Sequence, residues 1–245
     1  MSTQSTGLRL FWTEFRENKA ALLALVVVIL MILLALFASL ISPQNPYDLA
    51  NLSLMDSRRP PGFVGSGGYT HLLGTDPQGR DLLSAIFYGL RISIQIGLAA
   101  GFVSLTIGTA LGITAAYLGG RVEALIMRLI DLQLSFPAIL LALVIVALLG
   151  QGKAQLIGAL VAAQYAYFAR TAYGAAKAER GKDYIEAALA TPLSGRLVVW
   201  RHLLPNCAPP LIVVATVQIA NSISLEATLS FLGLGLPVTE PSLGM

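Results

Sequence analysis

The chain has 245 residues, of which 56% are hydrophobic and 12% charged, with a formal net charge of +3 and a mean hydropathy of +0.73. Because soluble domains carry about 25% charged residues, this composition indicates a membrane protein and not a soluble domain. The basic residues flank apolar runs and form no single patch, so no nucleic-acid partner is expected. The one cysteine, Cys207, excludes an intrachain disulfide and is interpreted as a small packing residue, not a nucleophile or metal ligand.

Residues 1–19 are predicted to form an interfacial helix with one apolar face; a frayed polar tail is the alternative. The residues of that face are Leu8, Phe11, Trp12 and Phe15. The uncharged run 20–41 is long enough to cross a hydrocarbon core of about 30 Å and predicts a first membrane span. Its length, and the acidic Glu14 and Glu17 before it, favour a permanent anchor over a cleaved signal peptide.

Residues 42–91 are expected to form a loop outside the cell membrane. Proline and glycine are frequent as far as Asp81, which indicates an irregular loop or small cap without a core of its own. Four further spans, five in all, are predicted from the uncharged runs 92–118, 132–152, 154–169 and 207–225. The predicted fold is therefore an all-α, polytopic membrane protein.

The distribution of basic residues predicts the orientation. With the N-terminus in the cytoplasm, eleven Lys and Arg residues lie inside and five outside, as the positive-inside rule requires. No ionisable residue lies within the five runs as drawn, which argues against a self-powered secondary transporter, an intramembrane hydrolase or a metal site. His71 and His202 are expected to be surface or interface residues in opposite compartments.

Two features of the spans concern packing. Small residues recur at every fourth position of the second span and predict close helix packing without a functional role. These residues are Ala100, Ser104, Gly108, Gly112 and Ala116. Pro137, a few residues into the third span, predicts either a simple kink or a flexible point beside a substrate path.

Residues 171–206 are the longest predicted inner loop. An alanine-rich helix is expected over 172–190, and Thr191-Pro192 then resembles an N-cap followed by proline at the first position of a second helix. That second helix is expected to end at Pro205. The segment is either a mere connector or a feature that a soluble partner grips.

Four motifs carry a family resemblance. An HLLGTD–GRD signature precedes the second span, with Gly74, Thr75, Asp76, Gly79, Arg80 and Asp81. An MR–D–FP stretch supplies Arg128, Asp131 and Pro137. An EAA element comprises Glu186, Ala187, Ala188, Pro192, Gly195, His202, Leu204 and Pro205. An SFLGLG–PS element contains Gly233 and Gly235. In this order they resemble permease subunits of bacterial ABC importers of the dipeptide, oligopeptide and nickel type, most closely the second, C-type permease.

The resemblance implies a MetI-like transmembrane core over 92–245, with 171–206 as the EAA coupling loop. It implies a multi-pass subunit of the bacterial cytoplasmic (inner) membrane that moves di- or oligopeptides or a related small solute. No catalytic residue, cofactor or metal is implied in this chain, because ATP and Mg would be bound by two cytoplasmic ABC ATPases. The other implied partners are a second homologous permease and a periplasmic or lipid-anchored substrate-binding protein.

Two departures from the family pattern stand out. Pro192 occupies the position of the family's glycine, so the turn between the coupling helices is expected to differ and coupling to be altered but not abolished. The family has six spans where five are predicted here, so a truncated chain or a non-functional remnant is an alternative. A stand-alone secondary transporter or channel is a further alternative.

Glu226, at the end of the fifth run, either faces the translocation path or pairs with an arginine of the outer loop.

Overall fold

The computed structural model describes residues 7–48, 52–185, 195–237, 239–240 and 242–244. They form two compact units, 1–91 and 92–245, which are described separately below. Helices account for most of the described residues, which confirms the predicted all-α class.

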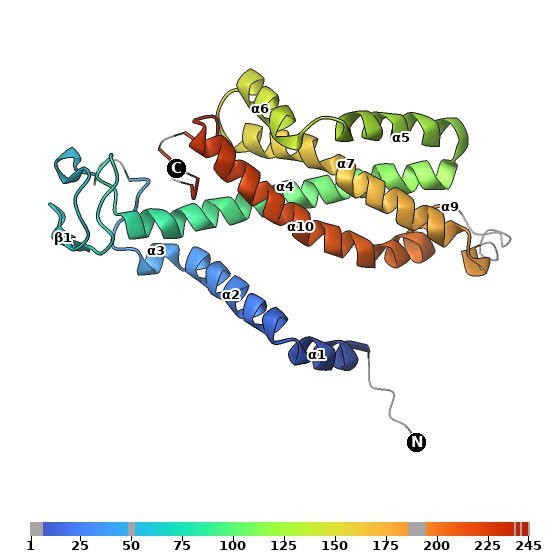
Figure 1. Cartoon of the computed structure of the whole chain (residues 1–245), viewed down its shortest axis with the longest axis horizontal. Helices are drawn as coiled ribbons and strands as arrows, with labels where there is room; N and C mark the ends of the chain where they lie inside the picture. Colours follow the sequence, from blue (N-terminus) through green and yellow to red (C-terminus); the bar gives the residue numbers. More distant parts are fainter. Residues whose placement is uncertain (1–6, 49–51, 186–194, 238, 241, 245) are drawn as a thin grey trace. The chain divides into compact units, whose positions relative to one another are not determined.

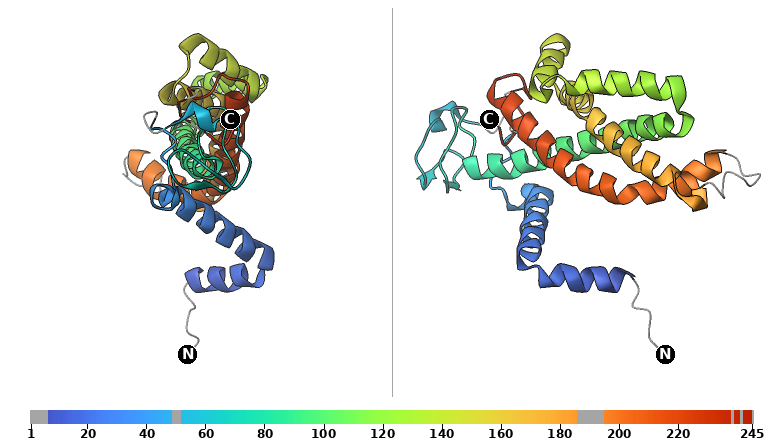
Figure 2. Two further views of the ribbon diagram at one scale, coloured as in Figure 1. Left: turned by 90° about the vertical axis from the view of Figure 1, so that its left-hand side faces the viewer. Right: turned by 45° about the vertical axis from the view of Figure 1, so that its right-hand side comes forward.

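The first unit begins with two helices that meet at a sharp bend (Figure 2). Helix α1 covers Gly7–Glu17, at the predicted amphipathic segment, and α2 covers Lys19–Leu36. Asn18 separates them because its side-chain Oδ1 accepts a hydrogen bond from the Ala21 amide at 3.1 Å and so caps α2. The short helix α3, Ala38–Ile41, continues towards the loop.

A small cap with its own hydrogen bonds follows. It contains η2 (Leu54–Asp56) and an antiparallel hairpin of β1 (Phe63–Val64) and β2 (Thr70–His71). The loop predicted over 42–91 is too long, because α4 begins at Leu82. Asp81 fixes that start: its Oδ2 accepts the Ser84 amide at 2.8 Å, as an N-cap carboxylate does.

The second unit consists of helices (Figure 1). It contains the larger part of α4 (Leu82–Leu118), followed by α5 (Gly120–Leu134), α6 (Ala138–Leu149), α7 (Lys153–Arg180), α9 (Gly195–Val198), the π-helical turn η3 (Val199–Leu203) and α10 (Leu204–Phe231). Gly119 and Gly120 have φ of +68° and +56°, and at this point the chain reverses from α4 into α5.

The predicted count of five spans is not confirmed. Among the described residues, three helices are long and apolar enough to cross a membrane: Lys19–Leu36, Leu82–Leu118 and Val199–Phe231. A fourth is possible only if α5 and α6 count as one broken span, because their axes differ by 89°. The break lies at Pro137, the N-cap of α6, so the run predicted as 132–152 is kinked there.

The predicted helices of segment 171–206 also need correction. Helix α7 runs without a break to Arg180, so no separate helix begins at 172. The later helix does not end at Pro205 but continues through η3 into α10. Pro205 follows directly on the π-helical turn, where the regular i→i−4 bonding is already interrupted, so its missing N–H costs less than in a regular helix interior.

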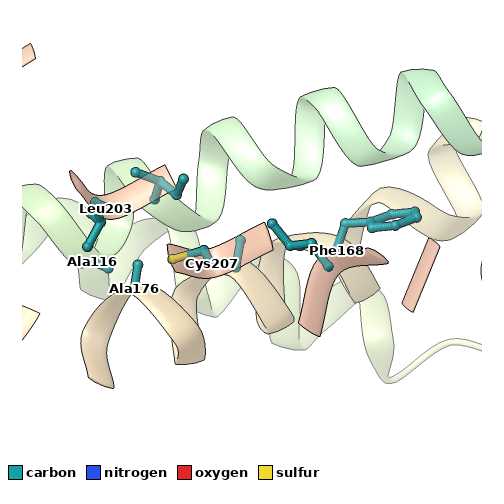
Figure 3. Close-up of a cluster of buried hydrophobic side chains, with 8 residues drawn as sticks. Ala116, Phe168, Ala176, Leu203 and Cys207 are labelled. Carbon is teal, nitrogen blue, oxygen red and sulfur yellow. The ribbon is translucent and has the colours of Figure 1, made fainter. Parts of the chain in front are cut away.

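Close helix contacts organise the second unit. A Cβ added at Gly108 or Gly112 of α4 would collide with the α7 backbone, and one at Gly101 would lie 2.6 Å from Ile219 Cγ1 of α10. The predicted close packing of the small residues is therefore confirmed. Cys207 is fully buried in an apolar cluster between α4, α7 and α10, which confirms its packing role (Figure 3).

Candidate functional site

Helix α10 carries a buried polar stripe along one face. Gln218, Ser222, Glu226 and Ser230 follow one another at intervals of four residues, and each is less than 9% exposed. Residues four apart stack on one face of an α-helix. The stripe continues the apolar side chains of the same face, which include Leu203, Cys207 and Leu211. A polar stripe inside a membrane-crossing helix must find polar partners within the protein.

Helix α7 supplies one such partner. The side-chain amide of Gln164, which is 1% exposed, shares a hydrogen bond of 2.8 Å with the Ser222 hydroxyl. Beside this contact lies a cavity of about 320 Å³. Its lining consists of Ala138, Gln164, Tyr167, Gln218, Asn221, Ser224, Leu225 and Thr228.

The other end of the stripe holds a buried carboxylate. Glu226 is fully buried and accepts hydrogen bonds of 2.8 Å from the hydroxyls of Ser93, on α4, and Ser230. Of the two alternatives given for Glu226, the described residues show no pairing with an outer-loop arginine; two serines are its hydrogen-bond partners instead. Because α10 extends to Phe231, Glu226 lies inside a candidate span, and the expectation that the spans lack ionisable residues is wrong.

A helix-end cluster, defined as Glu179, Lys182, Tyr184, His202 and Asn206, joins the end of α7 to the start of α10. Tyr184 Oη donates to Glu179 Oε2 at 2.5 Å and accepts from Asn206 Nδ2 at 3.1 Å. Lys182 Nζ donates to Glu179 at 2.5 Å, and this contact and the Tyr184 hydroxyl lower the pKa of Glu179. The hydrogen bond to Glu179 raises the pKa of Tyr184 to about 12.

Only part of the predicted EAA element can be placed. Glu186, Ala187, Ala188 and Pro192 lie outside the described residues. Among the others, Gly195 lies so close to the Tyr117 hydroxyl that a Cβ would displace it. His202 is half-buried, and its carbonyl accepts from Asn206 at 2.6 Å. Leu204 is half-buried and Pro205 is exposed, in the first turn of α10.

The structure brings the residues of the HLLGTD–GRD signature together in the cap. Arg80 donates to Asp76 through Nε at 2.8 Å, and Thr75 Oγ1 donates to the Asp56 carbonyl at 2.5 Å. Asp81 Oδ1 lies 3.1 Å from His71 Nδ1. His71 is only 1% exposed within the cap, so its predicted position at a surface or interface is wrong. These residues stabilise the small cap, and Asp81 in addition caps the N-terminus of helix α4. The sequence did not reveal this role.

Two glycines of the signature are required by the backbone. Gly74 and Gly79 have φ of +83° and +78°, a conformation that L side chains rarely adopt. A Cβ at Gly74 would meet the Arg59 carbonyl oxygen, and one at Gly79 the Ser53 carbonyl oxygen. The chain therefore folds tightly upon itself at both positions.

The remaining signature residues are spread over the second unit. Arg128 is exposed, and Asp131 pairs with Arg170 of α7 at 2.9 Å. Gly233, with φ of +75°, ends α10 in a Schellman arrangement: its amide donates to Ser230 O and the Leu234 amide to Leu229 O. A Cβ at Gly235 would collide with Ser230, which binds Glu226.

The sequence matches two families of known proteins. Residues 108–245 match the family described as "Binding-protein-dependent transport system inner membrane component". Residues 6–61 match the N-terminal TM domain of oligopeptide transport permease C.

Individual relatives match over nearly the whole chain. The dipeptide transport system permease protein DppC of Haemophilus influenzae is 35% identical over 98% of this chain and 80% of its own length. The di/tripeptide transport system permease protein DppC of Pseudomonas aeruginosa is 37% identical over 97% of this chain and 77% of its own. Among solved structures, an inward-facing MetNI methionine ABC transporter is 22% identical, with a TM-score of 0.48 over 59% of this chain and 74% of its own.

Proposed function

Since the chain belongs to the family of inner membrane components of binding-protein-dependent transport systems, we propose that it is the permease subunit of an ABC importer for di- or oligopeptides. Its relatives carry the names of dipeptide and di/tripeptide permeases, which supports this substrate class. In this proposal the N-terminus lies in the cytoplasm. ATP and Mg bind to two partner ATPases, a second permease completes the path, and a substrate-binding protein delivers the peptide.

One observation carries the coupling step. Segment 186–194, which includes Glu186, Ala187, Ala188 and Pro192 of the EAA element, is bounded on one side by α7 and on the other by α9, η3 and α10. Helices α7 and α10 are the two that line most of the polar cavity. Force applied to this segment would therefore act on the helices that surround a solute.

Two anchors connect the segment to the helices. On one side Ile185 is 2% exposed, and on the other Val198 is 2% exposed. The Tyr184–Asn206 hydrogen bond joins the two sides directly. Such a joined pair of helix ends would transmit a rigid-body displacement and not absorb it by local bending.

The test is reconstitution of the chain with its genomic partners in vesicles. We expect dipeptide uptake that needs ATP and the binding protein, and we expect Glu186→Ala to abolish co-purification of the ATPases and ATP-driven uptake. Glu14→Ala, the same change on α1, serves as the control and should retain both. Uptake without ATP, or an unaffected Glu186→Ala complex, contradicts the proposal.

The buried carboxylate of Glu226 favours a second candidate, a stand-alone secondary transporter. Ionisable groups inside membrane-crossing helices commonly serve ion coupling, and Glu226 lies within the candidate span Val199–Phe231. Under this alternative, uptake follows an imposed proton gradient without any ATPase and is lost in Glu226→Gln. The same vesicles, prepared with the permeases alone, decide between the two functions.

A further inference from the structure

The cavity between α6, α7 and α10 has an unusual lining for a membrane-embedded helix. Of its eight lining residues, three carry a side-chain amide and three a hydroxyl, and none is charged. The six polar residues are Gln164, Tyr167, Gln218, Asn221, Ser224 and Thr228. Four of them belong to α10, within the candidate span Val199–Phe231. Polar groups at such depth are costly towards lipid, so they are expected to face water, a solute or another polar surface.

The cavity has a fixed wall and an accessible rim. Gln164 is 1% exposed and Gln218 7%, and the Gln164–Ser222 hydrogen bond holds the two helices together behind them. Asn221, Ser224 and Thr228 are exposed on the described surface. Since the wall is already held in place, a ligand would not have to order it, which favours binding.

The chemistry of the lining restricts the ligand. An amide side chain donates and accepts hydrogen bonds, and so does a hydroxyl. The backbone amide of a peptide presents the same two functions. A site without charge cannot neutralise a carboxylate terminus, an ammonium terminus or a metal ion. The volume of about 320 Å³ lies at the lower end of the range of small-molecule sites, about 300–1,000 Å³.

A second groove on the same unit lacks these properties. It measures about 820 Å³ between α4 and α10 and is lined mainly by apolar side chains, among them Trp200, Leu204 and Ile212. Such a lining fits acyl chains or another helix better than a hydrated solute. The smaller, polar cavity is therefore the better candidate for contact with a peptide.

We propose that this polar cavity is where the transported peptide touches the subunit, and that its amides and hydroxyls bind the peptide backbone without reading its charged ends or side chains. The inference rests on the proposed function and adds the recognition chemistry. Peptides of different side-chain charge are then accepted alike at this point, because every peptide has the same backbone. Discrimination by charge takes place elsewhere in the transporter.

The first test introduces single cysteines at the cavity rim after the chain's one native cysteine has been removed. In a Cys207→Ala background of the complete transporter, Asn221→Cys and Ser224→Cys are treated with a water-soluble methanethiosulfonate. We expect both thiols to react and a dipeptide during turnover to slow the reaction at least fivefold. Ile212→Cys, on the apolar side of α10, is the control and should show no effect of peptide. Unreactive thiols at both positions, or rates that peptide does not change, overturn the proposal.

The second test separates contact from mere packing. Asn221→Asp adds a negative charge to the rim, so uptake of acidic dipeptides should fall at least fivefold relative to basic ones. The neutral Asn221→Ser should alter both rates by one common factor. A common factor for Asn221→Asp as well overturns the proposal. If the unmodified transporter showed no ATP-driven uptake, the proposed function itself would be contradicted. Failure of the proposed function and failure of the cavity proposal therefore give different results.

Discussion

The cap, residues 52–81, and the helix-end cluster both depend on polar contacts, but they bury them differently. In the cap His71, Arg80 and Asp81 are at most 4% exposed, and four glycines have positive φ, of which Gly74 and Gly79 also lie against backbone carbonyl oxygens. In the helix-end cluster the Lys182 side chain is 54% exposed. Buried hydrogen bonds are costly to break, whereas exposed ion pairs contribute little. The cap contacts should therefore contribute more to the stability of their region than the exposed Lys182 ion pair contributes to the helix-end cluster.

The largest effect is expected in the cap, from Gly79→Ala. The substitution combines a strained positive φ with a collision against the Ser53 carbonyl oxygen, and should destabilise the cap by about 3 kcal/mol. Hydrogen exchange of the cap amides, followed by mass spectrometry, measures this local loss.

Gly62→Ala provides the matched control for that substitution. Gly62 has nearly the same φ, +83°, but a Cβ there would meet nothing within 4 Å. Its cost should be the φ strain alone, about 1 kcal/mol. Equal exchange rates in the two variants would show that the close backbone approach at Gly79 does not contribute.

A smaller effect is expected from pH, again in the cap. Asp56 Oδ2 accepts from the hydroxyl and amide of Ser66 at 2.6 and 2.9 Å, and these hydrogen bonds lower the pKa of Asp56 below its ordinary value of 3.8. The stabilisation is therefore fully present above pH 3.8 and is lost as the pH falls through the lowered pKa. Amide protection in β1 and β2, corrected for intrinsic exchange, should decline in that range.

Asp56→Asn is the control for the pH effect. The variant should be less stable at neutral pH, because the charge-assisted hydrogen bonds are lost. Its decline below pH 3.8 should also be smaller than that of the unmodified chain, because the contribution of Asp56 is missing. A decline identical to that of the unmodified chain would assign the titration to another group.

The smallest effect is expected for an exposed ion pair between α5 and α7, which lies outside the helix-end cluster. Arg170 and Asp131 form an ion pair of 2.9 Å, but their side chains are 53% and 55% exposed. Arg170→Ala should change the thermal unfolding of the detergent-solubilised chain by at most about 1 kcal/mol, and added salt should reduce the difference further. A loss as large as that of Gly79→Ala would show that an exposed ion pair of this chain contributes as much as the buried contacts of the cap.

The sequence predicted features that depend on local composition. The apolar run at 20–41 predicted the α2 helix, because uninterrupted apolar length is itself the requirement for crossing a bilayer. Pro137 predicted the break before α6, because proline lacks the amide that would continue the helix. The motif order predicted the family, which the relatives confirm.

Tertiary packing decided the rest, because no local pattern records which side chain lies opposite another. Pro205 was expected to end a helix, but η3 and α10 accommodate it in a first turn. His71 was expected at a surface or interface, but it is 1% exposed within the cap and lies 3.1 Å from Asp81. The sequence already shows Gln218, Ser222, Glu226 and Ser230 at intervals of four residues. The meaning of this spacing depends on Gln164 and Ser93, which only the folded chain brings against α10.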